Sequence, residues 1–173
     1  WTVPAEIVRA YECVGFHMTD LPYGRGGSPL QHLILQGHRR TKLSAFRLTE
    51  QLDAGGVYFK QDLSLRGSAQ EIYVRASRLA AEMIRRLIDR PTSPRPQEGR
   101  AVRFRRRVPM QSRIPAVPDV RRLYDFIRML DAEGYPRAFL EHRDYRYEFS
   151  AARRQGRCVR ASVTIAPLAR VKR

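Results

Sequence analysis

The stretch FHMTDLPYGRGGSPLQ, residues 16–31, gathers side chains that could carry out chemistry. His17 closes an apolar segment, Asp20 follows it, and three glycines surround Arg25. Histidine titrates near neutral pH, so His17 could accept or release a proton during a reaction. The GRGG run lacks the GxxxxGK[ST] pattern of a phosphate-binding loop. The stretch therefore has two interpretations, a chemical site or a turn that connects a strand to a helix.

A second candidate, Asp53, lies in the loop TEQLDAGG, residues 49–56. An aspartate close to glycines is usually a turn residue, and a lone histidine at a strand end is usually structural or solvated. Each residue taken separately favours the structural interpretation, so the elements that position the two residues matter.

The hydrophobic pattern predicts strands and a helix around these candidates. Residues 12–17 form a short apolar run typical of a buried strand. Ser28-Pro29 is typical of a helix start, with serine at the N-cap and proline at the first helical position. Residues 42–48 and 57–63 alternate as strands do, with the Asp53 loop between them.

A longer helix and a change of composition follow. Ser68 and Glu71 have the spacing of a capping box, and apolar residues continue on one helical face to Leu87. Beyond Arg90 the sequence becomes rich in proline. Asp119 then predicts the cap of another helix, and the alternation predicts strands at 145–149 and 158–165.

Length and composition limit the class of protein. A chain of 173 residues forms one domain, or one domain with a small appendage, and its 43% hydrophobic content is too high for a disordered protein. There is no apolar run of the roughly 20 residues that a membrane helix needs, and no signal-peptide pattern. Because the chain begins at Trp1 and opens into strand-like sequence, we interpret that start as a cut. Cys13 and Cys158 are isolated, which favours a reducing cytoplasm, and no cluster of metal ligands predicts a metal.

The formal net charge of +16 invites a nucleic-acid interpretation. Only Lys42, Lys60 and Lys172 are lysines among the 33 basic residues, however, and a bias towards arginine can arise from the base composition of the genome alone, so the charge by itself is weak evidence. The exception is the cluster RAVRFRRR at residues 100–107. Four of its side chains are candidates for contact with a nucleic acid: Arg103, Arg105, Arg106 and Arg107.

Several motifs in order resemble one known family. HMTDLPYGRGGSP, residues 17–29, resembles the HxSLLPxxRGxxP signature of the folate-dependent formyltransferases, which include the methionyl-tRNA, glycinamide ribonucleotide and sugar-nucleotide enzymes. Gly37, Thr41 and Ser44 resemble the family's G…TGxT strand, and LDAG followed by Val57 resembles its LDxGxI loop. The resemblance runs from about Cys13 to Leu87 and resumes weakly at residues 105–114 and 127–139.

The resemblance implies an α/β fold, the second half of a Rossmann-like formyltransferase domain followed by a small α+β tail. Residues 1–90 would be the catalytic domain without its N-terminal half, 91–118 a linker, and 119–173 a small C-terminal region of helix and strands. The strand at 12–17 would then have an open apolar edge, and the chain alone is expected to be poorly active or inactive.

The resemblance also implies the chemistry. A primary amine attacks the formyl carbon of 10-formyltetrahydrofolate, which requires a proton acceptor and donors for the developing oxyanion. His17 would handle the proton and face the oxyanion, and Asp53 would be its electrostatic partner. The residues expected to border the folate are Thr49, Glu50, Gln51 and Leu52. The residues expected to border the acceptor are Thr19, Asp20, Arg25 and Gly26.

One departure from the family pattern concerns catalysis. The family usually has an asparagine two residues before the histidine, and this chain has Gly15. Losing one such donor typically costs about 10²–10³ in rate, so we expect Gly15→Asn to raise turnover.

Three functions stay open at this stage. The first is formyl transfer to an aminoacyl-tRNA or to an amino sugar on a nucleotide; the basic cluster favours tRNA, whereas the short tail argues against it. The second is hydrolysis of formyltetrahydrofolate on the same scaffold. The third is a non-catalytic remnant that binds nucleic acid or a partner, and a homo-oligomer is compatible with each.

Overall fold

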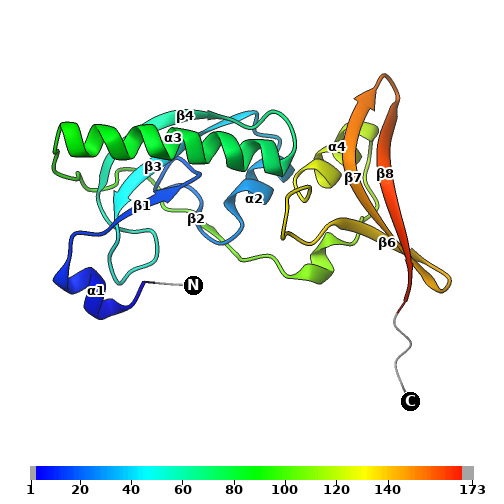
Figure 1. Cartoon of the computed structure of the whole chain (residues 1–173), viewed down its shortest axis with the longest axis horizontal. Coiled ribbons are helices and arrows are strands. Elements are labelled where there is room, and N and C mark those ends of the chain that lie inside the picture. Colours follow the sequence, from blue (N-terminus) through cyan, green and yellow to red (C-terminus); the bar gives the residue numbers. More distant parts are fainter. Residues whose placement is uncertain (1–2, 169–173) are drawn as a thin grey trace, which may run out of the picture. The chain divides into compact units, whose positions relative to one another are not determined.

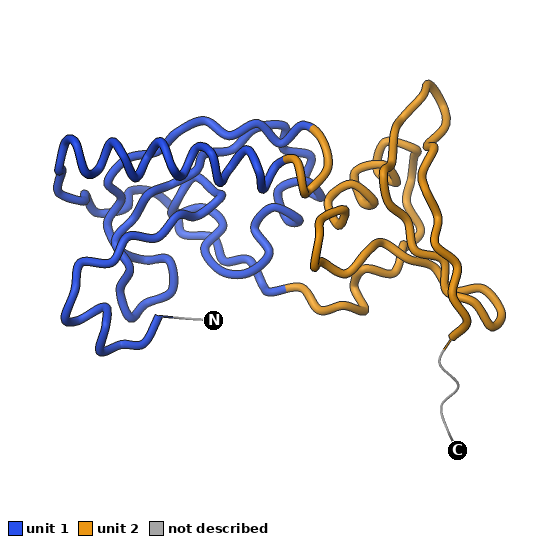
Figure 2. Tube along the Cα trace, viewed as in Figure 1, with its two compact units in different colours: residues 1–66, 72–106 blue, residues 67–71, 107–173 orange. Residues whose placement is uncertain are grey.

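The computed structural model describes residues 3–168 (Figure 1). The chain divides into two compact units, which Figure 2 distinguishes by colour. Unit 1 comprises Trp1–Arg66 and Ile72–Arg106, and unit 2 comprises Gly67–Glu71 and Arg107–Arg173. The segment 91–118, which we expected as a linker, is thus shared between the two units.

Unit 1 is built on a three-stranded antiparallel sheet with the order β1-β3-β4. Strand β1 (Val14–His17) pairs with β3 (Arg40–Arg47), and β3 pairs with β4 (Val57–Ser64). These strands confirm the one expected from a short apolar run and the two expected from alternation, to within two residues. In the register, His17 lies opposite Ser44 and Gly15 lies opposite Phe46.

Helix α3 (Ala69–Asp89) lies along one face of this sheet (Figure 1). The predicted capping box is confirmed, because the Ser68 amide donates to Glu71 Oε2 at 2.7 Å and the Glu71 amide donates to Ser68 Oγ at 3.3 Å. The apolar stripe of the helix packs Met83 against Leu43 and Ala45 of β3. This core fixes the strand that pairs with β1, from which the candidate histidine projects.

The short helix α2 (Pro29–Leu35) buries Leu30, Leu33 and Ile34. Ser28 occupies its N-cap position, but the expected serine cap is wrong. The backbone of Ser28 is left-handed, with φ 52°, and its side chain makes no capping hydrogen bond to the helix. A capping serine needs an extended backbone, which this tight glycine-rich entry does not provide.

Residues 95–104 pack against the strands and loops of unit 1, to which they belong. Strand β2 (Arg25–Gly26) pairs in parallel with β5 (Arg103–Phe104). Arg95 pairs with Val57 through hydrogen bonds of 2.7 and 2.9 Å in the two directions. The buried ring of Phe104 contacts the side chains of Tyr23 and His32.

The N-terminal segment corrects one expectation. Instead of strand-like structure, Ala5–Ala10 forms helix α1. Pro4 lies at its N-cap, Glu6 is in its first turn and Arg9 is in its last turn, which is the charge order that the helix dipole favours. These features at the two ends of the helix favour it over the strand that the sequence suggested.

Unit 2 contains the 3-10 helix η1 (Pro109–Ser112), helix α4 (Val120–Arg128) and an antiparallel sheet in the order β6-β7-β8. The strands are β6 (Ala138–His142), β7 (Tyr145–Gln155) and β8 (Cys158–Pro167). The Asp119 side chain caps α4 by accepting from the Arg122 amide at 2.8 Å, as predicted. The sequence pattern predicted β7 and β8 but not the short strand β6.

Within residues 3–168, no helix is both long and apolar enough to cross a bilayer. The same residues contain no group of three or more histidine, cysteine, aspartate or glutamate side chains arranged to hold a metal ion.

Candidate functional site

His17 is the last residue of β1, and its side chain is buried, with 8% of the residue exposed. Its Nε2 lies 2.8 Å from the carbonyl oxygen of Gly24. A carbonyl only accepts hydrogen bonds, so Nε2 carries the proton of this bond. The other ring nitrogen, Nδ1, is thereby identified as the atom that can gain or lose a proton while this contact persists.

Asp53 lies beside that second nitrogen. Its Oδ2 is 3.8 Å from His17 Nδ1 and accepts a 2.7 Å hydrogen bond from the Gly26 amide. Only 10% and 13% of the His17 and Asp53 side chains are exposed. The prediction that these two residues meet in one place is therefore confirmed, although they are 36 positions apart in the sequence.

The imidazole thus has a carbonyl within hydrogen-bonding distance of Nε2 and a carboxylate oxygen 3.8 Å from Nδ1. A ring held this way can carry a second proton next to a negative charge, and partial burial reduces the screening of that charge by salt. A histidine beside a carboxylate in this way is suited to proton transfer.

The loop after β1 depends on glycine for its path. Gly26 has φ 107°, and a Cβ there would collide with the Phe104 carbonyl oxygen. The close approach of β5 to this loop therefore requires glycine at this position. The same backbone path places the Gly26 amide where it donates to Asp53 Oδ2.

The four residues expected to border the acceptor have different environments. Thr19 is fully buried, its carbonyl accepts from Ser44 Oγ at 2.7 Å, and its hydroxyl has no partner among the described residues. Asp20 is exposed and pairs with Lys60. Arg25 donates twice to Gln97, and the Gly26 amide is used by Asp53. Of these four residues, only Asp20 presents an exposed side chain.

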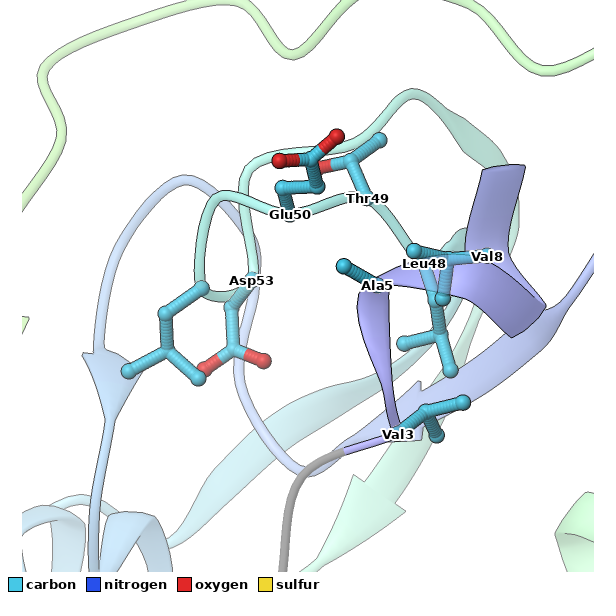
Figure 3. A pocket seen from close by; sticks show the side chains of 8 residues that line it. Val3, Ala5, Val8, Leu48, Thr49, Glu50 and Asp53 are labelled. Atoms are coloured by element: carbon cyan, nitrogen blue, oxygen red, sulfur yellow. The ribbon is translucent and has the colours of Figure 1, made fainter.

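The loop expected to border the folate lines a cavity of about 500 Å³. Figure 3 shows Val3, Ala5 and Val8 from the N-terminal segment near Leu48, together with Thr49, Glu50 and Asp53 from the loop. Leu52 also lines the cavity and is 56% exposed, whereas Gln51 is exposed but lies outside the lining. Asp53 thus belongs both to the cavity and to the histidine pair.

One ion pair joins α1 to this loop. Arg9 Nε donates to Glu50 Oε1 at 2.6 Å. This hydrogen bond, with the charge of Arg9, holds the pKa of the Glu50 carboxyl below its ordinary value. Sequence reasoning missed α1 as a wall of the cavity, because a six-residue helix is too short for its periodicity to be recognised.

A side chain at position 15 would come close to two neighbouring side chains. A Cβ there would lie 2.6 Å from Leu48 Cδ2 and 3.0 and 3.1 Å from two carbons of the Phe46 ring. The side chains of Leu48 and Phe46 therefore fill the space that an asparagine would need.

The basic cluster lies in two environments. Arg103, Arg105 and Arg106 are exposed and belong to unit 1. Arg107 belongs to unit 2 and is half-buried, its guanidinium lies 5.9 Å from the Phe126 ring, and burial lowers its pKa. Of the four candidates for nucleic-acid contact, Arg103, Arg105 and Arg106 present exposed side chains for an anionic partner.

Gln97 is the site residue that sequence reasoning missed. Its side-chain amide donates to the carbonyl oxygens of Asp53 and Gly55 and accepts from Arg25. It lies within a proline-rich stretch whose spacing gives no indication of these contacts.

Comparisons with known proteins identify the relatives of this chain. Residues 109–166 match the family described as methionyl-tRNA formyltransferase, C-terminal domain. The methionyl-tRNA formyltransferase of Rickettsia massiliae (strain Mtu5) is 33% identical over 90 residues, which is 50% of this chain and 30% of that protein. The chain thus spans about a third of the length of the curated relatives that it matches.

Two solved structures extend the match. The methionyl-tRNA formyltransferase from Clostridium thermocellum superposes with a TM-score of 0.94 at 48% identity, covering 96% of this chain and 74% of that one. HypX from Aquifex aeolicus in complex with tetrahydrofolic acid has a TM-score of 0.65 at 19% identity, covers 86% of this chain and 27% of that one, and shows the fold alone. These matches confirm the α/β formyltransferase fold and the β-rich C-terminal region expected from the motifs. The chain belongs to the formyltransferase family, among the members that resemble methionyl-tRNA formyltransferase.

Proposed function

We propose that this protein takes part in formyl transfer from 10-formyltetrahydrofolate to the amino group of an aminoacyl-tRNA. The observation that carries the proposal is the buried His17–Asp53 pair, of which Asp53 also lines the cavity beside residues 48–52. The pair supplies a titratable nitrogen beside a carboxylate, and the cavity supplies a place for the co-substrate next to it.

The reaction balances without another reactant. The amine nitrogen forms a bond to the formyl carbon, the bond from that carbon to the folate nitrogen breaks, and the proton lost by the amine is returned to the folate nitrogen. His17 would hold that proton at Nδ1, because Nε2 is committed to the Gly24 carbonyl. Asp53 would stabilise the protonated ring, and its own orientation is fixed by the Gly26 amide.

The cavity has the character expected for a co-substrate with a flat ring system. Val3, Ala5, Val8, Leu48 and Leu52 supply apolar surface, and a few polar groups lie among them. Sites for small ligands combine a mainly apolar lining with a few polar groups that fix orientation. In our proposal residues 49–52 border the folate.

The acceptor is the finer part of the proposal. Aminoacyl-tRNA is supported by the names of the relatives at 33% and 48% identity. It is also supported by the net charge of +16 and by the exposed arginines at 103, 105 and 106. We assign the nucleotide-linked amino sugar as the alternative acceptor. The two free cysteines, Cys13 and Cys158, support a reducing compartment such as the cytoplasm as the place of the reaction.

The test uses the complete protein encoded by the gene that contains this chain. The protein is incubated with 10-formyltetrahydrofolate and one of three acceptors, methionyl-tRNA, a nucleotide-linked amino sugar, or water alone. We expect formyl-methionyl-tRNA, detected by mass after deacylation, and its loss in His17→Gln. Release of formate at the same rate with and without amine would instead identify a hydrolase, and no reaction with any acceptor would identify a non-catalytic protein.

A further inference from the structure

The side chain of Gln97 uses its whole hydrogen-bonding capacity. Its Nε2 donates to the carbonyl oxygens of Asp53 at 2.9 Å and Gly55 at 2.7 Å. Its Oε1 accepts from Arg25 Nε at 3.0 Å and from Arg25 Nη2 at 2.7 Å. A carboxamide has two N–H donors and one oxygen with two lone pairs, so all four positions are occupied.

These four bonds join the two loops that hold the histidine pair. Arg25 lies between Gly24, whose carbonyl binds His17, and Gly26, whose amide binds Asp53. On the other side, Gln97 holds the backbone of Asp53 itself. Asp53 has φ 51°, a left-handed conformation that needs support when the residue is not glycine.

The segment that carries Gln97 is itself anchored on both sides. Arg95 pairs with Val57 through two backbone hydrogen bonds. Further along, the Val102 carbonyl accepts from the Arg25 amide at 2.9 Å, and the Phe104 carbonyl accepts from the Gly27 amide at 3.1 Å. Gln97 therefore projects from a fixed backbone, and its contacts do not depend on a free chain segment.

We propose that Gln97 is a positioning residue for the site: it holds the Gly24–Gly26 turn and the Asp53–Gly55 turn in register, so that the Asp53 carboxylate faces His17 Nδ1. The catalytic meaning of this role rests on the proposed formyl transfer. Without the Gln97 amide, two carbonyl groups and one guanidinium lose their shared partner, and the link between the two segments is lost. A misplacement of about 1 Å at a reacting centre can cost about 10²-fold in rate.

The chemistry of the site requires an amide here. A glutamate at 97 would keep the acceptors for Arg25, but it would place carboxylate oxygens against the carbonyls of Asp53 and Gly55. A methionine would keep the length of the side chain and remove every hydrogen bond. The exposed Gln155 near the tip of the β7–β8 hairpin provides the matched control, because Gln155→Met makes the same chemical change in unit 2.

The first experiment is nuclear magnetic resonance on the 173-residue chain, which tests the positioning without any reaction. In the unmodified chain, we expect slow exchange of the Gln97 side-chain amide protons and ring nitrogen shifts of His17 that report protonation at Nε2. In Gln97→Met and Gln97→Glu, the Gly26 amide should exchange at least about ten times faster and the His17 ring signals should move. Gln155→Met should change neither signal.

The second experiment is kinetic, on the complete protein. We expect Gln97→Met and Gln97→Glu to lower kcat by about 10- to 100-fold with a smaller change in KM, because the residue acts on geometry rather than on acceptor binding. Rapid exchange of the Gln97 side-chain amide in the unmodified chain would overturn the proposal, even if the variants failed to fold. Unchanged Gly26 and His17 signals in folded variants would overturn it as well. Altered signals in a protein that transfers no formyl group would support the positioning and refute the proposed function.

Discussion

Adding a side chain at Gly15 tests the packing beside the histidine strand. The minimal perturbation is Gly15→Ala, whose Cβ would lie 2.6 Å from Leu48 Cδ2 and about as close to the Phe46 ring as real contacts allow. Overpacking of this kind typically costs about 1–3 kcal/mol. Removing a glycine from a strand returns about 0.5–1 kcal/mol. The expected net loss of stability is therefore about 0–2.5 kcal/mol, and the larger Gly15→Asn should be at least as destabilising.

The assay is urea unfolding of the chain, followed through the backbone amide signals of β1 and β3, so that unit 1 is measured separately from unit 2. The close contact with Leu48 Cδ2 predicts coupling between the two sites. Leu48→Ala should offset part of the destabilisation, with a favourable coupling energy of about 0.5–3 kcal/mol in a double-mutant cycle. The reasoning is refuted if Gly15→Ala stabilises unit 1 by about 1 kcal/mol, or if the two substitutions act additively.

The same packing changes the catalytic expectation derived from sequence. An asparagine at 15 would require the side chains of Leu48 and Phe46 to shift, so we expect that Gly15→Asn alone does not raise turnover in the complete protein. Gly15→Asn combined with Leu48→Ala should raise kcat more than it changes KM, because an oxyanion donor acts mainly on the transition state. A gain from the single substitution would show that Leu48 moves aside without cost.

Three other substitutions probe the site, the basic cluster and the sheet. His17→Gln should lower kcat by about 10²–10⁴-fold in the complete protein, as measured by formyl-methionyl-tRNA formation. Replacing the three exposed arginines within residues 103–106 by serine should reduce the log–log salt slope of tRNA binding by about 0.9 for each duplex phosphate that they neutralise. The pKa of Tyr58 is raised to about 12, mainly by burial and secondly by the hydrogen bond to Glu12. The stabilising contribution of Tyr58 is present below its ordinary pKa of 10.0 and disappears as the pH rises towards 12. Tyr58→Phe should therefore make the free energy of unfolding, measured in urea, depend less on pH between 10 and 12.

The sequence was sufficient to predict the elements that repeat a pattern. Strand β1 lies in a short apolar run, β3 and β4 alternate over eight residues each, and α3 has a capping box and a continuous apolar stripe. The histidine and aspartate were predictable because both lie in motifs with recognisable neighbours. Helix α1 was not predicted, since six residues form fewer than two helical turns, and the short strand β6 was not predicted either.

Much of the site is made by main-chain atoms, and this limits what residue types reveal about it. His17 is oriented by the Gly24 carbonyl, Asp53 by the Gly26 amide, and Gln97 binds two further carbonyls. Every residue except proline has both groups, so no side chain in the sequence marks where these bonds form. What the sequence does show, through its glycines, is where the backbone leaves no room for a side chain. Gly26 is required because β5 passes against it, and any side chain there would displace the Phe104 carbonyl and, with it, the amide that holds Asp53. The glycines that first suggested a featureless turn are thus part of how the histidine pair is positioned.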